Sequence, residues 1–137
     1  MKIEMSRTLL IVKPDATKRN LIEYIIDRLQ EAHFKIVKKK ELQLNKSQAR
    51  QFYAVHEGKP FLDSLVKFMC SGTIVPMILE KNNAVNDLRA LIGATDPAKA
   101  ERGTIRFDIA EDIEKNSVHA SDSDANAKKE ISFFFNK

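Results

Sequence analysis

Short apolar runs rich in β-branched residues alternate with segments of helical periodicity along this chain, and this alternation restricts its fold most. The run at 7–13 (RTLLIVK) ends at Pro14, which cannot donate to a strand ladder and restricts the residue before it. A second buried run covers 73–80 (TIVPMILE), where Pro76 favours an edge strand or a bulge. We therefore expect strands at both places, with Lys13 at the end of the first.

Helices are expected where apolar residues recur at helical spacing or where a start signal precedes the segment. We expect Asn45 and Asn83 to be N-caps and Pro60 to begin a helix. The expected helices cover 21–32, 48–55, 60–69, 84–92 and 122–131. We also expect a strand over 34–44 that is exposed to solvent on one face, and a short strand over 117–119. A long loop is expected over 94–104 and a weak helical turn over 108–115. Strands and helices that alternate in this way predict an α/β sandwich.

Length and composition predict one domain in the cytoplasm. The chain has 137 residues, which suits a single domain spanning 1–137, and its 43% hydrophobic and 31% charged fractions are typical of soluble proteins. No apolar run approaches the roughly 18 residues that span a bilayer, and the N-terminal sequence lacks the apolar core of a signal peptide. Cys70 is the only cysteine, so neither an intrachain disulfide nor a zinc site is expected.

The charge balance leaves two kinds of ligand open. A net charge of +4 and a pI near 9.2 fit an anionic small molecule or a nucleic-acid surface, and composition does not separate them. We interpret the basic run 38–40 as solvated lysines on an exposed strand rather than as a phosphate site.

A histidine surrounded by polar groups stands just before the last expected helix. Within 116–123 (NSVHASDS), His119 has hydroxyls, an amide and a carboxylate as neighbours. Backbone N–H groups at a helix start attract anions, and neutral imidazole is nucleophilic at neutral pH. The alternative is a polar turn with an incidental histidine, because Ser and Asp are also ordinary helix caps. His33 and His56, expected at a helix end and between two helices, are weaker candidates.

Three further motifs accompany this segment. The sequence KPDA at 13–16 closes the first strand, Tyr53 and Phe61 flank Lys59-Pro60, and RGTIR at 102–106 precedes the histidine. In this order and spacing, from 8 to 130, the set resembles the nucleoside diphosphate kinases. The resemblance implies a ferredoxin-like βαββαβ core, an α+β antiparallel sheet covered by helices. It also implies ping-pong transfer of the γ-phosphoryl group of a nucleoside triphosphate, usually ATP, to nucleoside diphosphates, which maintains NTP and dNTP pools.

The resemblance also assigns roles to particular residues. It makes His119 the carrier of a phosphohistidine, with Glu130 and Ser121 orienting its ring and Tyr53 beside it. Arg89, Thr95 and Arg106 would bind the phosphates. Lys13 and Asn116 would bind the sugar hydroxyls, and the base would stack on Phe61. Glu130 follows His119 by eleven residues, so only a helix that returns past the site would join them.

Magnesium and a homo-oligomer are further implications of the resemblance. Mg²⁺ would bridge the nucleotide's phosphates, which needs no dedicated carboxylate cluster. Asp122 either reaches this ion through water or caps the last helix. Short bacterial members of the family are tetramers or hexamers, and the choice between these stays open.

The chain departs from the family pattern at several positions. Ala120 stands where Gly is usual, so an ordinary backbone conformation is expected there. Asn20 and Glu23 also replace common glycines, and Asn tolerates the left-handed region well. The three aromatics at 133–135 are expected to pack on the core or on a neighbouring subunit.

Two functions from other classes compete with the enzyme. A nucleotide- or nucleic-acid-binding regulator would suit the basic pI and Phe61, but the chain lacks the aromatic signature of RNA-binding domains of this fold, so nucleic acid is disfavoured. A scaffold built on an inactive kinase is disfavoured as well, because every matched catalytic position holds a competent residue.

Overall fold

The computed structural model describes residues 5–135, which form a four-stranded antiparallel sheet in the order β2-β3-β1-β4. The strands are β1 (Met5–Val12), β2 (Lys35–Lys39), β3 (Val75–Asn82) and β4 (Val118–Ala120). The helices are α1 (Pro14–Lys18), α2 (Ile22–Glu31), α3 (Lys46–Phe52), α4 (Leu62–Met69), α5 (Ala84–Ile92), α6 (Ile105–Ile109) and α7 (Asp124–Phe135), with 3₁₀ turns η1 (Ala54–His56) and η2 (Pro97–Lys99). This α+β arrangement confirms the expected ferredoxin-like fold.

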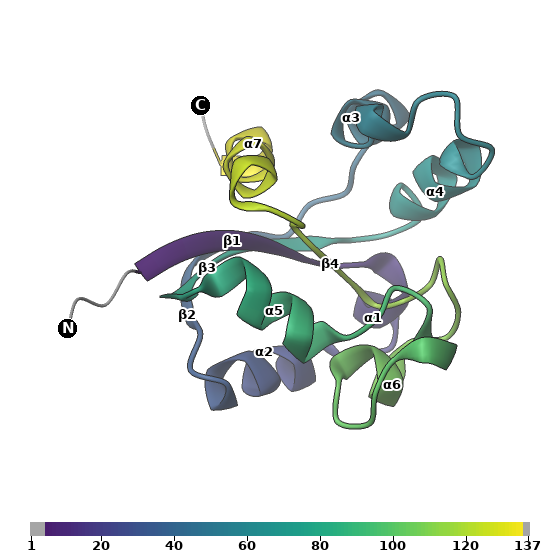
Figure 1. Cartoon of the computed structure of the whole chain (residues 1–137). Coiled ribbons are helices and arrows are strands. Elements are labelled where there is room, and N and C mark those ends of the chain that lie inside the picture. Colours follow the sequence, from purple (N-terminus) through teal and green to yellow (C-terminus); the bar gives the residue numbers. More distant parts are fainter. Residues whose placement is uncertain (1–4, 136–137) are drawn as a thin grey trace.

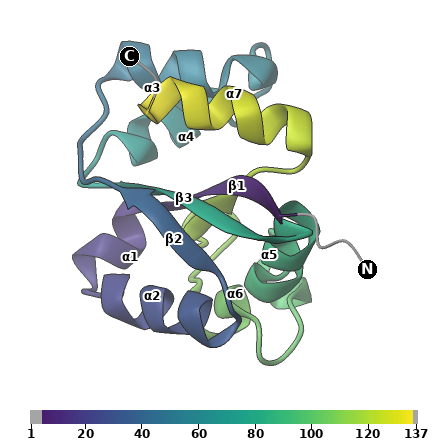
Figure 2. The ribbon, with the colours of Figure 1, turned by 90° about the vertical axis from the view of Figure 1, so that its left-hand side faces the viewer.

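Helices cover both faces of the sheet. α3, α4 and α7 lie on one face, while α2, α5 and α6 lie on the other (Figures 1 and 2). Leu9 and Ile11 of β1 pack with the first set, and Leu10 and Val12 pack with the second. Because successive strand residues point to opposite faces, a strand covered on both sides is apolar throughout. This explains the continuous apolar run of β1.

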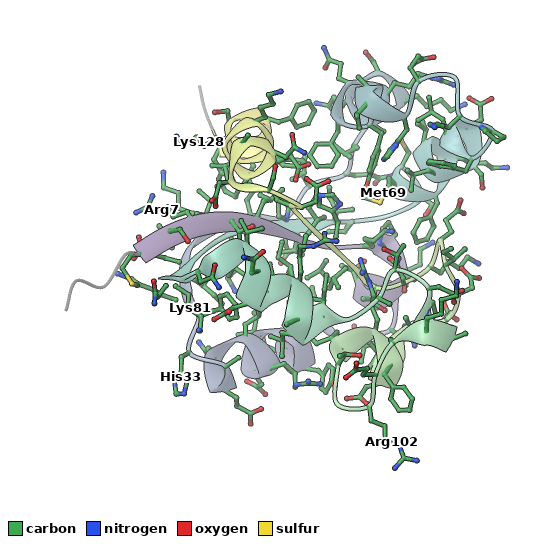
Figure 3. All side chains as sticks on the ribbon, viewed as in Figure 1. Arg7, His33, Met69, Lys81, Arg102 and Lys128 are labelled. Atoms are coloured by element: carbon green, nitrogen blue, oxygen red, sulfur yellow. The ribbon has the colours of Figure 1, made fainter. Side chains whose placement is uncertain are left out.

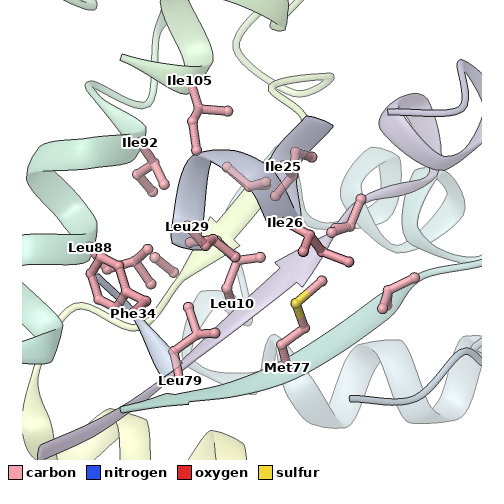
Figure 4. Packing of buried hydrophobic residues seen from close by; sticks show 14 of the residues in the cluster. Leu10, Ile25, Ile26, Leu29, Phe34, Met77, Leu79, Leu88, Ile92 and Ile105 are labelled. Carbon is pink, nitrogen blue, oxygen red and sulfur yellow. The ribbon is translucent and has the colours of Figure 1, made fainter. Parts of the chain in front are cut away.

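The core on the α2 and α5 side is closely packed. Leu10 and Leu79 of the sheet lie against Leu29 of α2 and Leu88 of α5, and all four are fully buried (Figure 4). Burial of a Leu side chain stabilises a fold by roughly 1.5–3 kcal/mol. The apolar stripe expected over 21–32 is thus the face with which α2 packs on the sheet.

The expectation of an edge position for Pro76 was wrong. β3 is an interior strand, and the carbonyl of Pro76 accepts from the Lys40 N–H at 3.2 Å, just beyond the end of β2. The N and C=O of one strand residue point to the same side, so the missing N–H faces the place where β2 has ended. The irregularity lies in β2 itself, between Ile36 and Lys38, and the strand is shorter than the expected 34–44.

Several helices also differ from expectation. α3 covers 46–52 rather than 48–55, and α4 begins at Leu62 rather than at Pro60. The helix near 108–115 is α6, which begins after Thr104, whose hydroxyl accepts from the Phe107 N–H at 3.3 Å. Asn83 precedes α5 with φ +58° but caps nothing, because the hydroxyl of Ser6 accepts from the first helical N–H instead. α7 continues to Phe135 and buries Phe134, which is 5% exposed.

Backbone conformations at two departures from the family pattern are as expected. Asn20 has φ +60°, and Ala120 lies in β4 with ordinary strand backbone. None of the helices within residues 5–135 combines the length and apolar character needed to cross a membrane.

Candidate active site

A cavity of about 960 Å³ opens where β4, η1, α5 and α7 meet. Val118 and Ala120 belong to the core on the α2 side, so the residue between them points to the opposite face. This residue is His119, which pairs with Ile11 of β1 and lines the cavity. The alternation of a three-residue strand therefore directs the imidazole into the cavity.

Glu130 contacts the imidazole of His119, and Ser121 in turn contacts Glu130. α7 returns over the sheet (Figure 2), and Glu130 Oε1 lies 2.9 Å from His119 Nε2. The same oxygen accepts from Ser121 Oγ at 2.6 Å. A carboxylate only accepts hydrogen bonds, so the contact requires the ring proton on Nε2. The lone pair is then on Nδ1, the nitrogen left for a ligand.

Aromatic rings enclose the histidine on the α3 side. The ring of Phe52 meets that of His119 edge-on with centroids 5.3 Å apart, and the ring of Tyr53 does so at 6.3 Å. Burial, and then the negative charge of Glu130, raise the pKa of Tyr53. Its hydroxyl is therefore a neutral hydrogen-bonding group at any working pH.

Lys13 and Asn116 form a hydrogen-bonded pair at one wall. Lys13 follows β1, is 6% exposed, and donates from Nζ to Asn116 Oδ1 at 2.9 Å and to the Glu114 carbonyl at 3.0 Å. Asn116 Nδ2 donates in turn to the Thr95 carbonyl at 3.1 Å. Burial, and then the nearby Arg106, lower the pKa of Lys13 to about 8.

Two arginines and a threonine form another wall. Arg106 is buried and donates from Nη1 to the Gly93 carbonyl at 2.9 Å and from Nη2 to the Val118 carbonyl at 2.7 Å. Arg89 and Thr95 are exposed and line the cavity. Burial, and then the charge of Arg89, lower the pKa of Arg106 to about 10, so its guanidinium stays cationic at neutral pH. Paired cations at a cavity wall favour an anionic ligand.

The mouth of the cavity is apolar. Phe61 is 46% exposed, and the ring of His56 packs edge-on against it at 5.1 Å. Val55 and Ile113 are also exposed and line the same cavity. A flat ring held at the mouth suits a planar ligand group.

The carboxylate of Asp122 suits a metal ion that is bound mainly by a ligand's phosphates and by water rather than by protein side chains. Among the residues that the structure describes, no group of three His, Cys, Asp or Glu side chains could hold a metal ion. Asp122 lines the cavity, and a hydrogen bond from Asn126 at 2.6 Å is the main cause that lowers its pKa. Such a donor set fits Mg²⁺ that keeps its waters and takes phosphate oxygens.

The fold brings the site residues expected from the sequence together. Nine line the cavity, namely Lys13, Tyr53, Phe61, Arg89, Thr95, Arg106, Asn116, His119 and Glu130. The tenth, Ser121, is buried behind it and acts on it through Glu130. His33 projects outward from the end of α2 (Figure 3) and takes no part. His56 does line the cavity, although the sequence made it a weaker candidate than His119.

Sequence reasoning missed several lining residues. Phe52 lies next to Tyr53, one of the expected site residues, and this position was a usable signal. Ile113 is an apolar residue in an acidic loop, which was a second signal. Phe133, Asn126 and Lys129 reach the cavity from α7, whose course was not predictable in detail.

Comparison with known proteins assigns this fold and site to the phosphotransferases. The family model described as nucleoside diphosphate kinase matches residues 6–137. Curated nucleoside diphosphate kinases from Nitratiruptor sp. and Chloroherpeton thalassium are 53% and 54% identical over 131 residues, covering 96% of this chain and 96% and 93% of theirs. The solved enzyme of Aquifex aeolicus has a TM-score of 0.93 at 39% identity, covering 96% of both chains. That of Halobacterium salinarum, in complex with CDP, has a TM-score of 0.94 at 39% identity, covering 98% of this chain and 90% of its own.

The chain therefore belongs to the nucleoside diphosphate kinase family. It is a phosphotransferase that binds nucleotides.

Proposed function

We propose that this enzyme moves the γ-phosphoryl group of ATP to nucleoside diphosphates through a phosphohistidine on His119, and so maintains NTP and dNTP pools. One observation carries the proposal: the contact of Glu130 with Nε2 leaves the lone pair of the ring on Nδ1. An uncharged but basic nitrogen at the base of a cationic cavity is suited to accept a phosphoryl group.

In the first step, the Nδ1 lone pair attacks the γ-phosphorus. The N–P bond forms, and the bond to the bridging oxygen breaks, so that its electron pair leaves with the nucleoside diphosphate. The imidazole becomes cationic, and the carboxylate of Glu130 stabilises this charge. In the second step a terminal phosphate oxygen of the acceptor diphosphate attacks the same phosphorus, the N–P bond breaks, and neutral His119 returns.

The cavity walls position the nucleotide for both steps. Arg89, Thr95 and Arg106 offset the charge of the transferred phosphoryl oxygens, a contribution that dominates this chemistry. Lys13 and Asn116 bind the sugar hydroxyls, with Lys13 also reaching a phosphate.

The base stacks on Phe61, which every base can do, so base discrimination is weak. The CDP bound to the relative from Halobacterium salinarum supports a nucleoside diphosphate as ligand of this cavity too.

Mg²⁺ is the proposed cofactor, and a homo-oligomer, tetramer or hexamer, in the cytoplasm is the proposed state. When bound, Mg²⁺ supplies charge neutralisation and alignment of the phosphates. Asp122 would hold it through a water, and Tyr53 would donate its hydroxyl proton to a phosphoryl oxygen or to the ring.

Mass spectrometry of the intact protein tests the proposal. Brief exposure to ATP and Mg²⁺ should add one phosphoryl group that survives alkali and is lost in acid. His119→Ala should remove this adduct and essentially all turnover, whereas His56→Ala, which also lies at the cavity, should keep the adduct. A fully active His119→Ala variant would refute the mechanism.

A further inference from the structure

Asp15 is a buried carboxylate that the proposed mechanism does not use. It lies on α1 two residues after Lys13, and its side chain is 2% exposed. Oδ2 accepts from Ser117 Oγ at 3.1 Å and lies 3.6 Å from Arg19 Nη2. Oδ1 is buried with no hydrogen-bond partner within residues 5–135. A buried carboxylate with one oxygen unpaired costs free energy, so its hydrogen bonds alone do not account for it.

The hydrogen bond from Ser117 ties Asp15 to the turn that carries Asn116. Ser117 is fully buried and has φ +78°, a conformation that non-glycine residues seldom adopt. Its carbonyl accepts from the Lys13 N–H at 2.9 Å, and the Lys13 ammonium donates to Asn116. Asp15 therefore fixes the turn on which both sugar-binding side chains depend.

The charge of Asp15 also acts on Lys13. Burial and Arg106 lower the pKa of Lys13, and three carboxylates, Asp15, Glu114 and Asp112, oppose this. Asp15 has the largest effect of the three, and it alone is buried, since Glu114 is half-buried and Asp112 exposed. Water and salt screen the exposed carboxylates more than the buried one.

We propose that Asp15 is a positioning residue that acts on Lys13 through Ser117: its buried carboxylate holds the turn that keeps the Lys13 ammonium beside Asn116. The inference rests on the proposed function in one respect, namely that Lys13 binds nucleotide. Without this carboxylate, only Glu114 and Asp112 would oppose the effects of burial and Arg106, and the pKa of Lys13 would fall toward neutral pH. Nucleotide binding would then weaken as the pH rises.

The first test measures the pKa of Lys13 and does not depend on kinase activity. The ¹³Cε resonance of Lys13 is assigned with Lys13→Arg and titrated in wild type, Asp15→Asn and Asp27→Asn, whose exposed carboxylate on α2 is the matched control. The pKa of Lys13 should be about 8 in the wild type and in the control. In Asp15→Asn it should fall by roughly one unit, as loss of a nearby opposite charge commonly causes. Asp15→Ser, a smaller neutral variant, is titrated in the same way if Asp15→Asn does not fold.

The second test follows kcat/KM for the nucleotide against pH. In Asp15→Asn the alkaline limb of this profile should move to lower pH by the same one unit. At high pH this lowers kcat/KM tenfold, because KM rises while kcat stays the same. An unchanged Lys13 titration in a folded Asp15 variant overturns the inference, and so does a shifted titration with an unmoved alkaline limb. If instead the wild type forms no phosphohistidine, the proposed function fails, while the NMR titration still decides the effect of Asp15 on Lys13.

Discussion

Replacing Glu130 by Gln should slow phosphorylation of His119 about tenfold. Oε1 of Glu130 accepts from both His119 Nε2 and Ser121 Oγ, at 2.9 and 2.6 Å. Hydrogen bonds to charged groups contribute roughly 1.5–3 kcal/mol, about twice the value of neutral ones. An amide oxygen can still accept from the ring but carries no charge, so about 1–1.5 kcal/mol of transition-state stabilisation is lost, close to a factor of ten. Glu130→Ala loses the whole contact and should cost about a hundredfold.

Rapid-quench measurement of a single turnover with ATP isolates this step from product release. The acid-labile adduct on the protein is quantified against time at saturating nucleotide, so the rate constant reports chemistry rather than binding. Glu23→Gln is the control, since it removes the same charge at an exposed position on α2. Its rate should equal that of the wild type.

A double-mutant cycle with Ser121→Ala separates orientation from charge. Ser121 touches the carboxylate and not the cavity, so Ser121→Ala should cost less than Glu130→Gln, and the two effects should not add. Equal rates for wild type, Glu130→Gln and Glu130→Ala would show that the carboxylate has no part in activating His119. The assignment of the nucleophile to Nδ1 would then lose its support.

Three other perturbations have definite expected outcomes. Phe61→Ala should weaken nucleotide binding by roughly 1–3 kcal/mol whatever the base, as measured by calorimetry with purine and pyrimidine diphosphates; selective loss of one base would contradict simple stacking. Arg106→Lys should lower kcat and kcat/KM together, because one ammonium cannot span the two carbonyls that the guanidinium now binds, and wild-type steady-state constants would exclude Arg106 from the site. Because the pKa of Lys13 is lowered from 10.5 to about 8, the unfolded chain binds more protons than the folded chain between those values. The free energy of unfolding should therefore rise by up to about 3 kcal/mol over that window, measured by urea denaturation, and Lys13→Met should abolish the rise.

The sheet was predictable because its signals are local. An apolar run bounded by a proline predicts β1, and the helical spacing of the apolar residues in 21–32 predicts the face of α2 that covers the sheet. The expected cap of α5 failed because a distant group takes the place of a local one. The N–H at the start of α5 is satisfied by Ser6, 78 residues away, and not by the adjacent Asn83. Propensity at a single position carries no information about such a partner.

The cavity was predictable as a set of residues and not as a geometry. Ordered motifs identified nine lining residues, but the sequence alone could not show that Glu130 reaches His119, since the helix between them had an uncertain length and course. Arg106 illustrates the same limit, because its side chain binds the carbonyl of Val118 as well as facing the cavity. One arginine thus holds in place the strand that carries the nucleophile, a role that no motif indicates.

The position of Glu130 depends on apolar packing at the far end of α7. Phe134 lies one helical turn after Glu130, and it packs in the core with Leu9 and against Phe52, ring centroids 5.2 Å apart. Phe52 in turn meets the ring of His119. Burial of an aromatic side chain is worth several kcal/mol, more than the hydrogen bond between Glu130 and His119. The hydrophobic contact therefore fixes where α7 lies, and the hydrogen bond only completes a geometry that the core has already set.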